Sequence, residues 1–301
     1  MKGGNHMRKE EILQEYENEL KRIGKSQKTI DGYLFNINKF LDWLKETGGE
    51  SFTGLLTPIE VKSYRSYLDT VQKASLSTIN TKLSAIQSFC NFLNIKCGNQ
   101  VIKVEKKKGC ITPKVDVLSK QELFQFRKYV QGNASLLHQV IVETILNTGM
   151  RESEIVALEL SDIKNLDSTK NSYIIIRSGK GDKYREIGIT GDYKVLLREW
   201  LDHRPLTDSQ KIFVGNRGTL TANGIYKLIH RLGLQKGLNV YPHMLRHQYL
   251  TQVAKNCHSL EDIKALQEIA GHASSDTTMK FYIHGSAETK ERLISNLNYF
   301  E

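Results

Sequence analysis

The chain has 301 residues, of which 39% are hydrophobic and 25% are charged, and this composition is typical of a soluble globular protein with two domains. Its formal net charge of +10 and its pI near 9.2 indicate a polyanionic partner, either nucleic acid or an anionic membrane surface. No run of about 18 apolar residues is present to span a bilayer, and the first residues lack the apolar segment of a signal peptide. These features disfavour an integral membrane protein and a secreted protein.

The cysteine content also disfavours a secreted protein. The four cysteines show neither CxxC spacing nor the crowding of a small disulfide-rich protein; they are Cys90, Cys97, Cys110 and Cys257. We therefore expect reduced thiols in a cytoplasmic protein.

The first part of the chain is predicted to be helical. We expect residues 1–7 to be an added or disordered start ahead of the folded protein, with the natural start at Met7. Apolar residues then recur at helical spacing over residues 8–23 and again over residues 26–45, and Gly48-Gly49 closes the second segment.

Two further helices complete this part. Thr57-Pro58-Ile59-Glu60 is a capping box with proline at the first helical position, and it predicts a third helix through Leu68. A fourth helix is expected to begin at Ser77, with an apolar face that includes Ile79 and Leu83. We predict a small helical bundle over residues 8–97, which taken alone is also consistent with a generic interaction module.

Residues 98–117 break this periodicity. The segment contains Gly98, the run Lys106-Lys107-Lys108-Gly109 and Pro113, so we predict a basic interdomain linker. A linker between two basic domains is well placed to cross a phosphate backbone, and Lys106, Lys107 and Lys108 are the candidates for that contact.

Residues 118–301 are predicted to form a second domain. Helices are expected from Leu118, over residues 135–148 and around residues 151–158, and later over residues 193–201, 223–232, 244–254 and 259–270. Between them, residues 172–177 and 183–189 resemble two strands joined by Ser178-Gly179-Lys180-Gly181-Asp182, the only clear β-hairpin in the chain. The predicted fold class is mainly α, with a small β-hairpin or sheet, in two domains.

Several separated motifs in this second domain carry chemistry. Pro242-His243-Met244-Leu245-Arg246-His247 places His243 and Arg246 three residues apart on one face of a helix start, where backbone N–H groups favour an anion. Arg151 follows Gly149 upstream, with Glu154 one turn later to fix its guanidinium through a bidentate pair. Gly271-His272 and Phe281-Tyr282-Ile283-His284 follow downstream.

In this order, the two arginines, two histidines and tyrosine resemble the catalytic signature of the tyrosine recombinase (phage integrase) family. The resemblance implies a four-helix core-binding domain over residues 8–97 and a catalytic domain over residues 118–301. It implies a site-specific DNA recombinase that cleaves and rejoins strands through a covalent 3′-phosphotyrosine, as in integration, excision or resolution of a mobile element. No cofactor is expected.

The resemblance also assigns roles to single residues. It makes Tyr282 the nucleophile, Arg151 and Arg246 the phosphate clamp, His243 the proton acceptor and His272 a donor to the phosphate. Lys180, at the hairpin tip, corresponds to the lysine that protonates the leaving 5′ oxygen, and Glu154 to the acidic residue that supports the first arginine. In the core-binding domain, Lys28, Asn80 and Lys82 become candidates for DNA contact.

His243 and His247 lie four residues apart on a predicted helix, a spacing at which two histidines can chelate a metal. The metalloprotease pattern requires glutamate after the first histidine, and Met244 occupies that position. We predict no metal site.

The C-terminal segment, residues 287–301, places Leu293, Ile294, Leu297 and Phe300 in an apolar stripe. It can fold back onto its own domain, or dock into a neighbouring protomer as an exchange helix in the manner of the family. We expect a monomer in solution that forms a tetramer on double-stranded DNA with inverted half-sites, in the cytoplasm at the nucleoid.

Two other functions remain compatible with the sequence. A type IB topoisomerase has a similar site and relaxes DNA by cleaving one strand. A noncatalytic sequence-specific DNA-binding protein would show the same charge and the same helical organisation.

Overall fold

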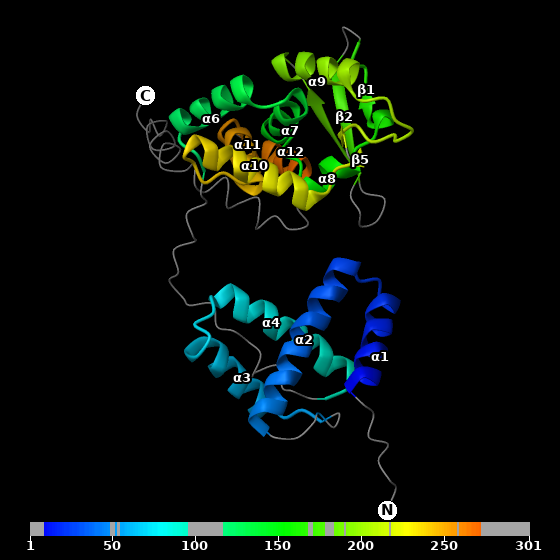
Figure 1. Cartoon of the computed structure of the whole chain (residues 1–301), viewed down its shortest axis with the longest axis vertical. Coiled ribbons are helices and arrows are strands. Elements are labelled where there is room, and N and C mark those ends of the chain that lie inside the picture. The colour runs from blue at the N-terminus through cyan, green and yellow to red at the C-terminus, as the bar shows by residue number, and fades with distance from the viewer. Residues whose placement is uncertain are drawn as a thin grey trace, which may run out of the picture. The chain divides into compact units, whose positions relative to one another are not determined.

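The computed structural model describes residues 9–48, 52, 55–95, 117–167, 171–177, 184–189, 191–216, 218–257 and 259–271. The chain divides into two compact units, Met1–Thr112 and Pro113–Glu301 (Figure 1). Both are mainly helical and the second also carries small sheets, so the predicted fold class is confirmed. The predicted linker lies outside the described residues, apart from Val117.

The described helices of the first unit are α1 (Lys9–Arg22), α2 (Gln27–Gly48), α3 (Pro58–Thr70) and α4 (Leu76–Phe92). Each contributes at least one aromatic side chain to a shared core, in which Tyr16 packs edge-on against Phe89 and Phe40 packs against Tyr64. All four rings are almost fully buried. Because aromatic side chains bury large areas, this cluster supplies much of the apolar burial of the bundle.

Capping side chains set where these helices begin. At α3, the backbone N–H of Thr57 donates to Glu60 Oε2 at 2.6 Å, and the Glu60 N–H donates to Thr57 Oγ1 at 3.3 Å, which is the predicted capping box. The fourth helix begins one residue earlier than expected, because Ser75 is its N-cap and its hydroxyl accepts from Thr78.

The second unit is built around α7 (Leu136–Thr148), whose buried side chains include Val140, Ile141 and Ile145. The other described helices of this unit, including the 3₁₀ turn η1, are α6 (Lys120–Asn133), α8 (Glu152–Ala157), η1 (Leu160–Asp162), α9 (Gly191–His203), α10 (Ala222–Lys236), α11 (Pro242–Lys255) and α12 (Leu260–Ala270). α7 contacts α9, α11 and β3, so it lies at the centre of the unit (Figure 1).

An antiparallel sheet borders this core, in the order β1 (Ile163–Lys164), β2 (Ser172–Arg177) and β3 (Tyr184–Ile189). Ile174 of β2 pairs with Ile187 of β3, and both side chains are buried. The residues between β2 and β3 lie outside the described part of the chain.

The prediction of a single clear hairpin was wrong. A second antiparallel pair joins β4 (Val214–Gly215) to β5 (Gly218–Thr219), and β1 adds a third strand to the first sheet. These strands have two residues each, which is too short for the period-two pattern that predicts a strand. Among the described helices, none is long and apolar enough to span a membrane.

Candidate active site

The site begins at the turn between α7 and α8. α7 ends at Gly149, which adopts the left-handed conformation with φ of 61°. A Cβ atom at this position would lie 2.4 Å from the Tyr249 ring, so both the backbone conformation and the space require glycine. The turn places Arg151 at the N-cap position of α8, with its side chain 41% exposed.

Glu154 accepts hydrogen bonds from both the backbone and the side chain of Arg151 across this turn. Its Oε2 accepts from the backbone N–H of Arg151 at 2.8 Å, and its Oε1 accepts from Arg151 Nη1 at 3.0 Å. The predicted pairing of Glu154 with Arg151 is present, but the side-chain contact is a single hydrogen bond rather than the expected bidentate pair.

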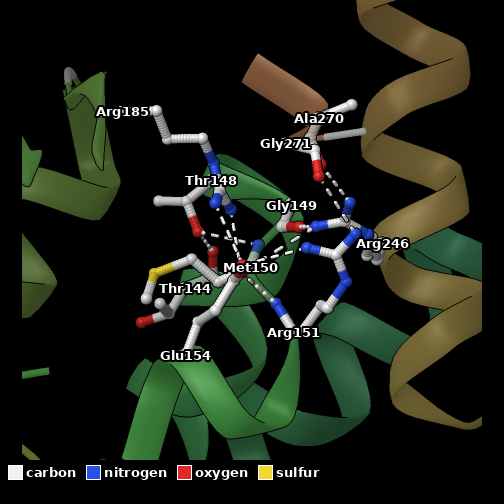
Figure 2. Close-up of polar contacts among 10 residues, drawn as sticks. All are labelled: Thr144, Thr148, Gly149, Met150, Arg151, Glu154, Arg185, Arg246, Ala270 and Gly271. Carbon is white, nitrogen blue, oxygen red and sulfur yellow. Dashed lines mark hydrogen bonds and ion pairs between the residues drawn. The ribbon is translucent and has the colours of Figure 1, made fainter. Parts of the chain in front are cut away.

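The bidentate partner of Glu154 is Arg185 of β3, which the sequence did not suggest as a site residue. Arg185 Nη1 donates to Oε1 at 3.0 Å and Nη2 donates to Oε2 at 2.8 Å (Figure 2). Burial raises the pKa of Glu154, but the hydrogen bonds and charges of Arg185 and Arg151 outweigh it and lower the pKa to about 2. Glu154 is therefore ionised at any physiological pH.

Arg246 enters the same region from α11. Its side chain is only 3% exposed, and its Nη1 donates to the carbonyl oxygen of Gly149 while Nη2 donates to that of Ala270 at 2.5 Å. Burial, followed by the nearby charge of Arg151, lowers the pKa of Arg246 to about 10. The guanidinium therefore remains charged near neutral pH, held mainly by carbonyl oxygens.

The two predicted clamp arginines meet at the end of α12. Arg151 Nη2 donates to the carbonyl oxygen of Gly271 at 3.4 Å, next to the Ala270 carbonyl that Arg246 binds (Figure 2). Three guanidinium groups thus surround one carboxylate, which leaves a local excess of positive charge. Such a cluster is suited to an anion with several oxygen atoms, such as a phosphodiester.

His243 lies at the start of α11, in the same helical turn as Arg246. Its Nε2 lies 2.6 Å from Nε2 of His247, so one of these two nitrogens carries the shared proton. Desolvation of the ring and the charge of Arg246 lower the pKa of His243. Near neutral pH the ring is therefore mostly neutral, which is the form that can accept a proton.

The other predicted catalytic residues, Lys180, His272 and Tyr282, lie outside the described part of the chain, as do Lys106, Lys107, Lys108 and the segment 287–301. Of the candidate DNA contacts in the first unit, Lys28 is exposed, whereas Asn80 and Lys82 are half-buried. Lys82 Nζ donates to Gln72 Oε1 at 3.4 Å, and the side-chain oxygen of Asn80 is buried with no hydrogen-bond donor among the described residues.

Within the described ranges, no cluster of three or more His, Cys, Asp or Glu side chains could hold a metal ion. The two histidines of α11 point at each other and have no acidic third ligand in that part of the structure.

One feature of the sequence indicates that Arg185 has a buried partner. In β3 it alternates with Ile187 and Ile189, both of which are buried, so the period of two places Arg185 on the inner face of the strand. A charged residue on an apolar strand face requires a partner, and such a partner can come from a distant part of the chain.

Comparison with known proteins agrees with this geometry. The profile of the "Phage integrase family" matches residues 116–289, and that of the "Phage integrase, N-terminal SAM-like domain" matches residues 12–94. A tyrosine recombinase XerC of Psychromonas ingrahamii is 30% identical over 275 residues, covering 87% of each chain. A XerC of Pediococcus pentosaceus is 29% identical over 283 residues, covering 89% of this chain and 90% of the relative.

The fold also matches a solved structure of the XerH site-specific recombinase, bound to a palindromic difH substrate in a post-cleavage complex. The TM-score is 0.71 at 20% sequence identity, over 98% of this chain and 91% of XerH. The relatives named here are recombinases, which favours that function over a topoisomerase or a noncatalytic DNA-binding protein. The chain therefore belongs to the phage integrase family and is a Xer-like tyrosine recombinase, an enzyme that acts at specific sites to cleave and rejoin DNA.

Proposed function

We propose that this recombinase cleaves DNA by attack of Tyr282 on a phosphodiester, with Arg151 and Arg246 holding the phosphate, and that it needs neither a divalent metal nor ATP. The observation that supports this most directly is the convergence of both guanidinium groups on the Ala270 and Gly271 carbonyls. His272 follows Gly271 in the sequence, so the arginines meet where the next catalytic motif begins.

The two arginines supply the electrostatic part of the catalysis. A phosphodiester gains negative charge on its non-bridging oxygens in the transition state, and donors positioned beforehand stabilise that charge. Each charge-assisted hydrogen bond contributes about 1.5 to 3 kcal/mol. Because Arg246 is already held by two carbonyl oxygens, little reorganisation is needed when DNA binds.

Proton transfers complete the reaction. The phenol of Tyr282 has an ordinary pKa of about 10, so forming the phenolate at pH 7 costs about 4 kcal/mol. His243 accepts that proton, and the phenolate oxygen bonds to phosphorus as the bond to the 5′ oxygen breaks. Lys180 protonates the departing 5′ oxygen, while His272 donates to a phosphate oxygen.

The covalent 3′-phosphotyrosine conserves the energy of the phosphodiester bond. A 5′ hydroxyl from a second duplex then attacks phosphorus, and Tyr282 leaves and recovers its proton. The reaction therefore needs no external energy source.

We propose that the DNA target has inverted half-sites, by analogy with the palindromic substrate named for XerH. The protein is proposed to be a monomer when free in the cytoplasm and to form a tetramer on this DNA. Lys28, Asn80, Lys82 and Lys106–Lys108 are proposed to contact the DNA backbone, and residues 287–301 to dock into a neighbouring protomer. Deleting residues 286–301 should spare binding to one half-site but abolish cooperative assembly; unchanged cooperativity in a gel-shift titration contradicts the docking role.

The test of the proposed chemistry uses duplexes selected from a random library by binding to this protein, with a nick placed in the selected site to trap cleavage. Wild-type protein should form a covalent adduct in excess chelator, and Tyr282→Phe should bind the same duplex without forming it. An adduct that disappears with chelator and returns with magnesium contradicts the metal-free part. An adduct that persists in Tyr282→Phe contradicts the assignment of the nucleophile.

A further inference from the structure

Arg185 has no role in the proposed chemistry, yet its side chain is as buried as that of Glu154, at 9% and 10% exposure. Both of its terminal nitrogens donate to Glu154, Nη1 to Oε1 at 3.0 Å and Nη2 to Oε2 at 2.8 Å. Its Nε is buried with no hydrogen-bond acceptor in the described part of the chain. A buried guanidinium has a large desolvation cost, so its placement requires a strong compensating interaction.

Glu154 holds the Arg185 guanidinium in place, and this guanidinium occupies the space beside Gly271. A Cβ added at Gly271 would lie 3.0 Å from Arg185 Nη1 and 3.7 Å from Arg151 Nη1. The left-handed conformation of Gly271, with φ of 57°, independently disfavours a side chain there. Arg185 therefore pairs with the carboxylate that holds Arg151 and lies close to Gly271, the residue before His272 in the sequence (Figure 2).

The Glu154 carboxylate accepts from both the backbone and the side chain of Arg151, so the orientation of the carboxylate determines that of the Arg151 guanidinium. Oε1 accepts from both Arg151 Nη1 and Arg185 Nη1, each at 3.0 Å. Oε2 accepts from Arg185 Nη2 and from the backbone N–H of Arg151, each at 2.8 Å. Among the described residues, without Arg185 only Arg151 would hold the carboxylate at these distances, because Arg246 Nη1 lies 4.0 Å away.

We propose that Arg185 is a positioning residue for DNA cleavage, which locks the Glu154 carboxylate so that Arg151 presents its guanidinium to the scissile phosphate. This inference rests on the proposed role of Arg151 as a phosphate clamp. It assigns Arg185 no contact with DNA: the guanidinium acts through Glu154.

A matched control exists in the same unit. Arg127 of α6 forms a bidentate pair with Glu143 of α7, with Nε to Oε1 and Nη2 to Oε2 both at 2.8 Å. Both pairs are bidentate, although Arg127 uses Nε and Nη2 where Arg185 uses Nη1 and Nη2. Arg127 is 50% exposed and has no described contact with Arg151 or Arg246. Arg127→Met therefore removes a bidentate ion pair from the same unit without changing the partners of Glu154, and it should not slow cleavage.

The first experiment measures the single-turnover rate of covalent adduct formation on the selected nicked duplex. Arg185→Met should slow this rate about 10- to 100-fold, as expected for loss of charge-assisted hydrogen bonds, with DNA affinity retained. Arg185→Lys keeps the charge without the bidentate geometry and should recover part of the rate. Arg127→Met should react at the wild-type rate. Thermal unfolding of each variant identifies any that fail to fold, in which case Arg185→Lys carries the test.

A double-mutant cycle distinguishes positioning from direct phosphate contact. If Arg185 acts through Glu154, Arg185→Met combined with Glu154→Gln should be no slower than the slower single variant. Additive losses would mean that Arg185 acts on the DNA itself, and would overturn the inference.

The pH dependence gives a second readout. The charged groups facing the Glu154 carboxylate are Arg151 of α8, Arg185 of β3 and Arg246 of α11; Tyr249 of α11 lies near Arg185. Removing Arg185 takes away the largest influence that lowers the pKa of Glu154, so this pKa should rise and Arg185→Met should lose additional rate relative to wild type as the pH is lowered. Taking the ratio to wild type cancels the titration of His243, which both proteins share.

The two proposals fail in different ways. If Arg185→Met reacts at the wild-type rate with an unchanged pH profile while Arg151→Ala is slow, the positioning role is wrong. If Arg151→Ala also reacts at the wild-type rate, the phosphate clamp itself is wrong.

Discussion

Arg246 donates a hydrogen bond from Nη2 to the carbonyl oxygen of Ala270 at 2.5 Å, and this contact joins α11 to the last residue of α12. Ala270 lies two residues before His272 in the sequence. One side chain of the His243–Arg246 motif is therefore fixed directly to the segment that leads into the next motif. Since Arg246 also donates to Gly149, it connects three separated segments of the chain.

We predict that Arg246→Ala and Arg151→Ala each reduce the adduct rate by about 100-fold or more while retaining much of the DNA affinity. Affinity comes from many phosphate contacts, whereas the transition state depends on these two guanidinium groups. Gel shifts and single-turnover assays on the same duplex measure the two effects. Lys227→Ala, at an exposed position on α10, is the control. Parallel losses of affinity and rate in the arginine variants would contradict the assignment.

Gly149→Ala is predicted to destabilise the protein more than Gly237→Ala. Both glycines end helices in the left-handed conformation, with φ of 61° and 80°, so both variants carry a backbone cost of about 1 kcal/mol. Only at Gly149 would the new Cβ meet a side chain, Tyr249, while nothing lies within 4 Å at Gly237. Chemical denaturation measures the difference. Equal losses at the two sites would show that Tyr249 moves aside without cost.

Acid should destabilise the protein through Glu154. Its folded-state pKa of about 2 lies below the ordinary value of 4.5, so the ionised form stabilises the fold above pH 4.5. That contribution, about 3 kcal/mol, is lost as the pH falls from 4.5 towards 2. Denaturant unfolding of wild type and Glu154→Gln over this range measures it. The variant should be less stable above pH 4.5 and converge on wild type below it; a constant difference is the contrary result.

His247 is predicted to support the protonated form of His243. When His243 takes up a proton, its Nε2 can donate to Nε2 of His247, which lies 2.6 Å away. His247→Ala should therefore lower the pKa of His243 further and move the acid limb of the adduct rate to lower pH. His203→Ala, at an exposed position on α9, is the control. An unmoved acid limb in His247→Ala would show that the two rings titrate independently.

Local signals predicted the helices well. The Thr57 and Glu60 capping box and the Ser119 and Glu122 pair near the expected start at Leu118 both form hydrogen bonds in the structure, because each depends on residues only three positions apart. The resemblance to a family supplied Arg151, Glu154, Arg246 and His243, and the structure brings the first three together. His243 lies at the same helix start.

Arg185 was missed because its importance is non-local. It lies 31 residues from Glu154 in the sequence, after the glycine-containing segment between β2 and β3. No spacing rule connects a strand residue to a short helix that precedes it. For the same reason, the sequence predicted Arg151 as the bidentate partner of Glu154, whereas that partner is Arg185. Arg151 is only three residues from Glu154 in the sequence, but the backbone N–H of Arg151 already occupies one carboxylate oxygen. The strands β1, β4 and β5 have two residues each, which is too short to show the alternation of apolar and polar residues that predicts a strand.

The most direct test of the account is the identification of the residue that becomes covalently joined to DNA. After reaction with the selected nicked duplex and digestion by nuclease and protease, mass spectrometry should find a nucleotide 3′-phosphate on the peptide that contains Tyr282. A link at another residue, or through a 5′-phosphate, would contradict the proposed mechanism.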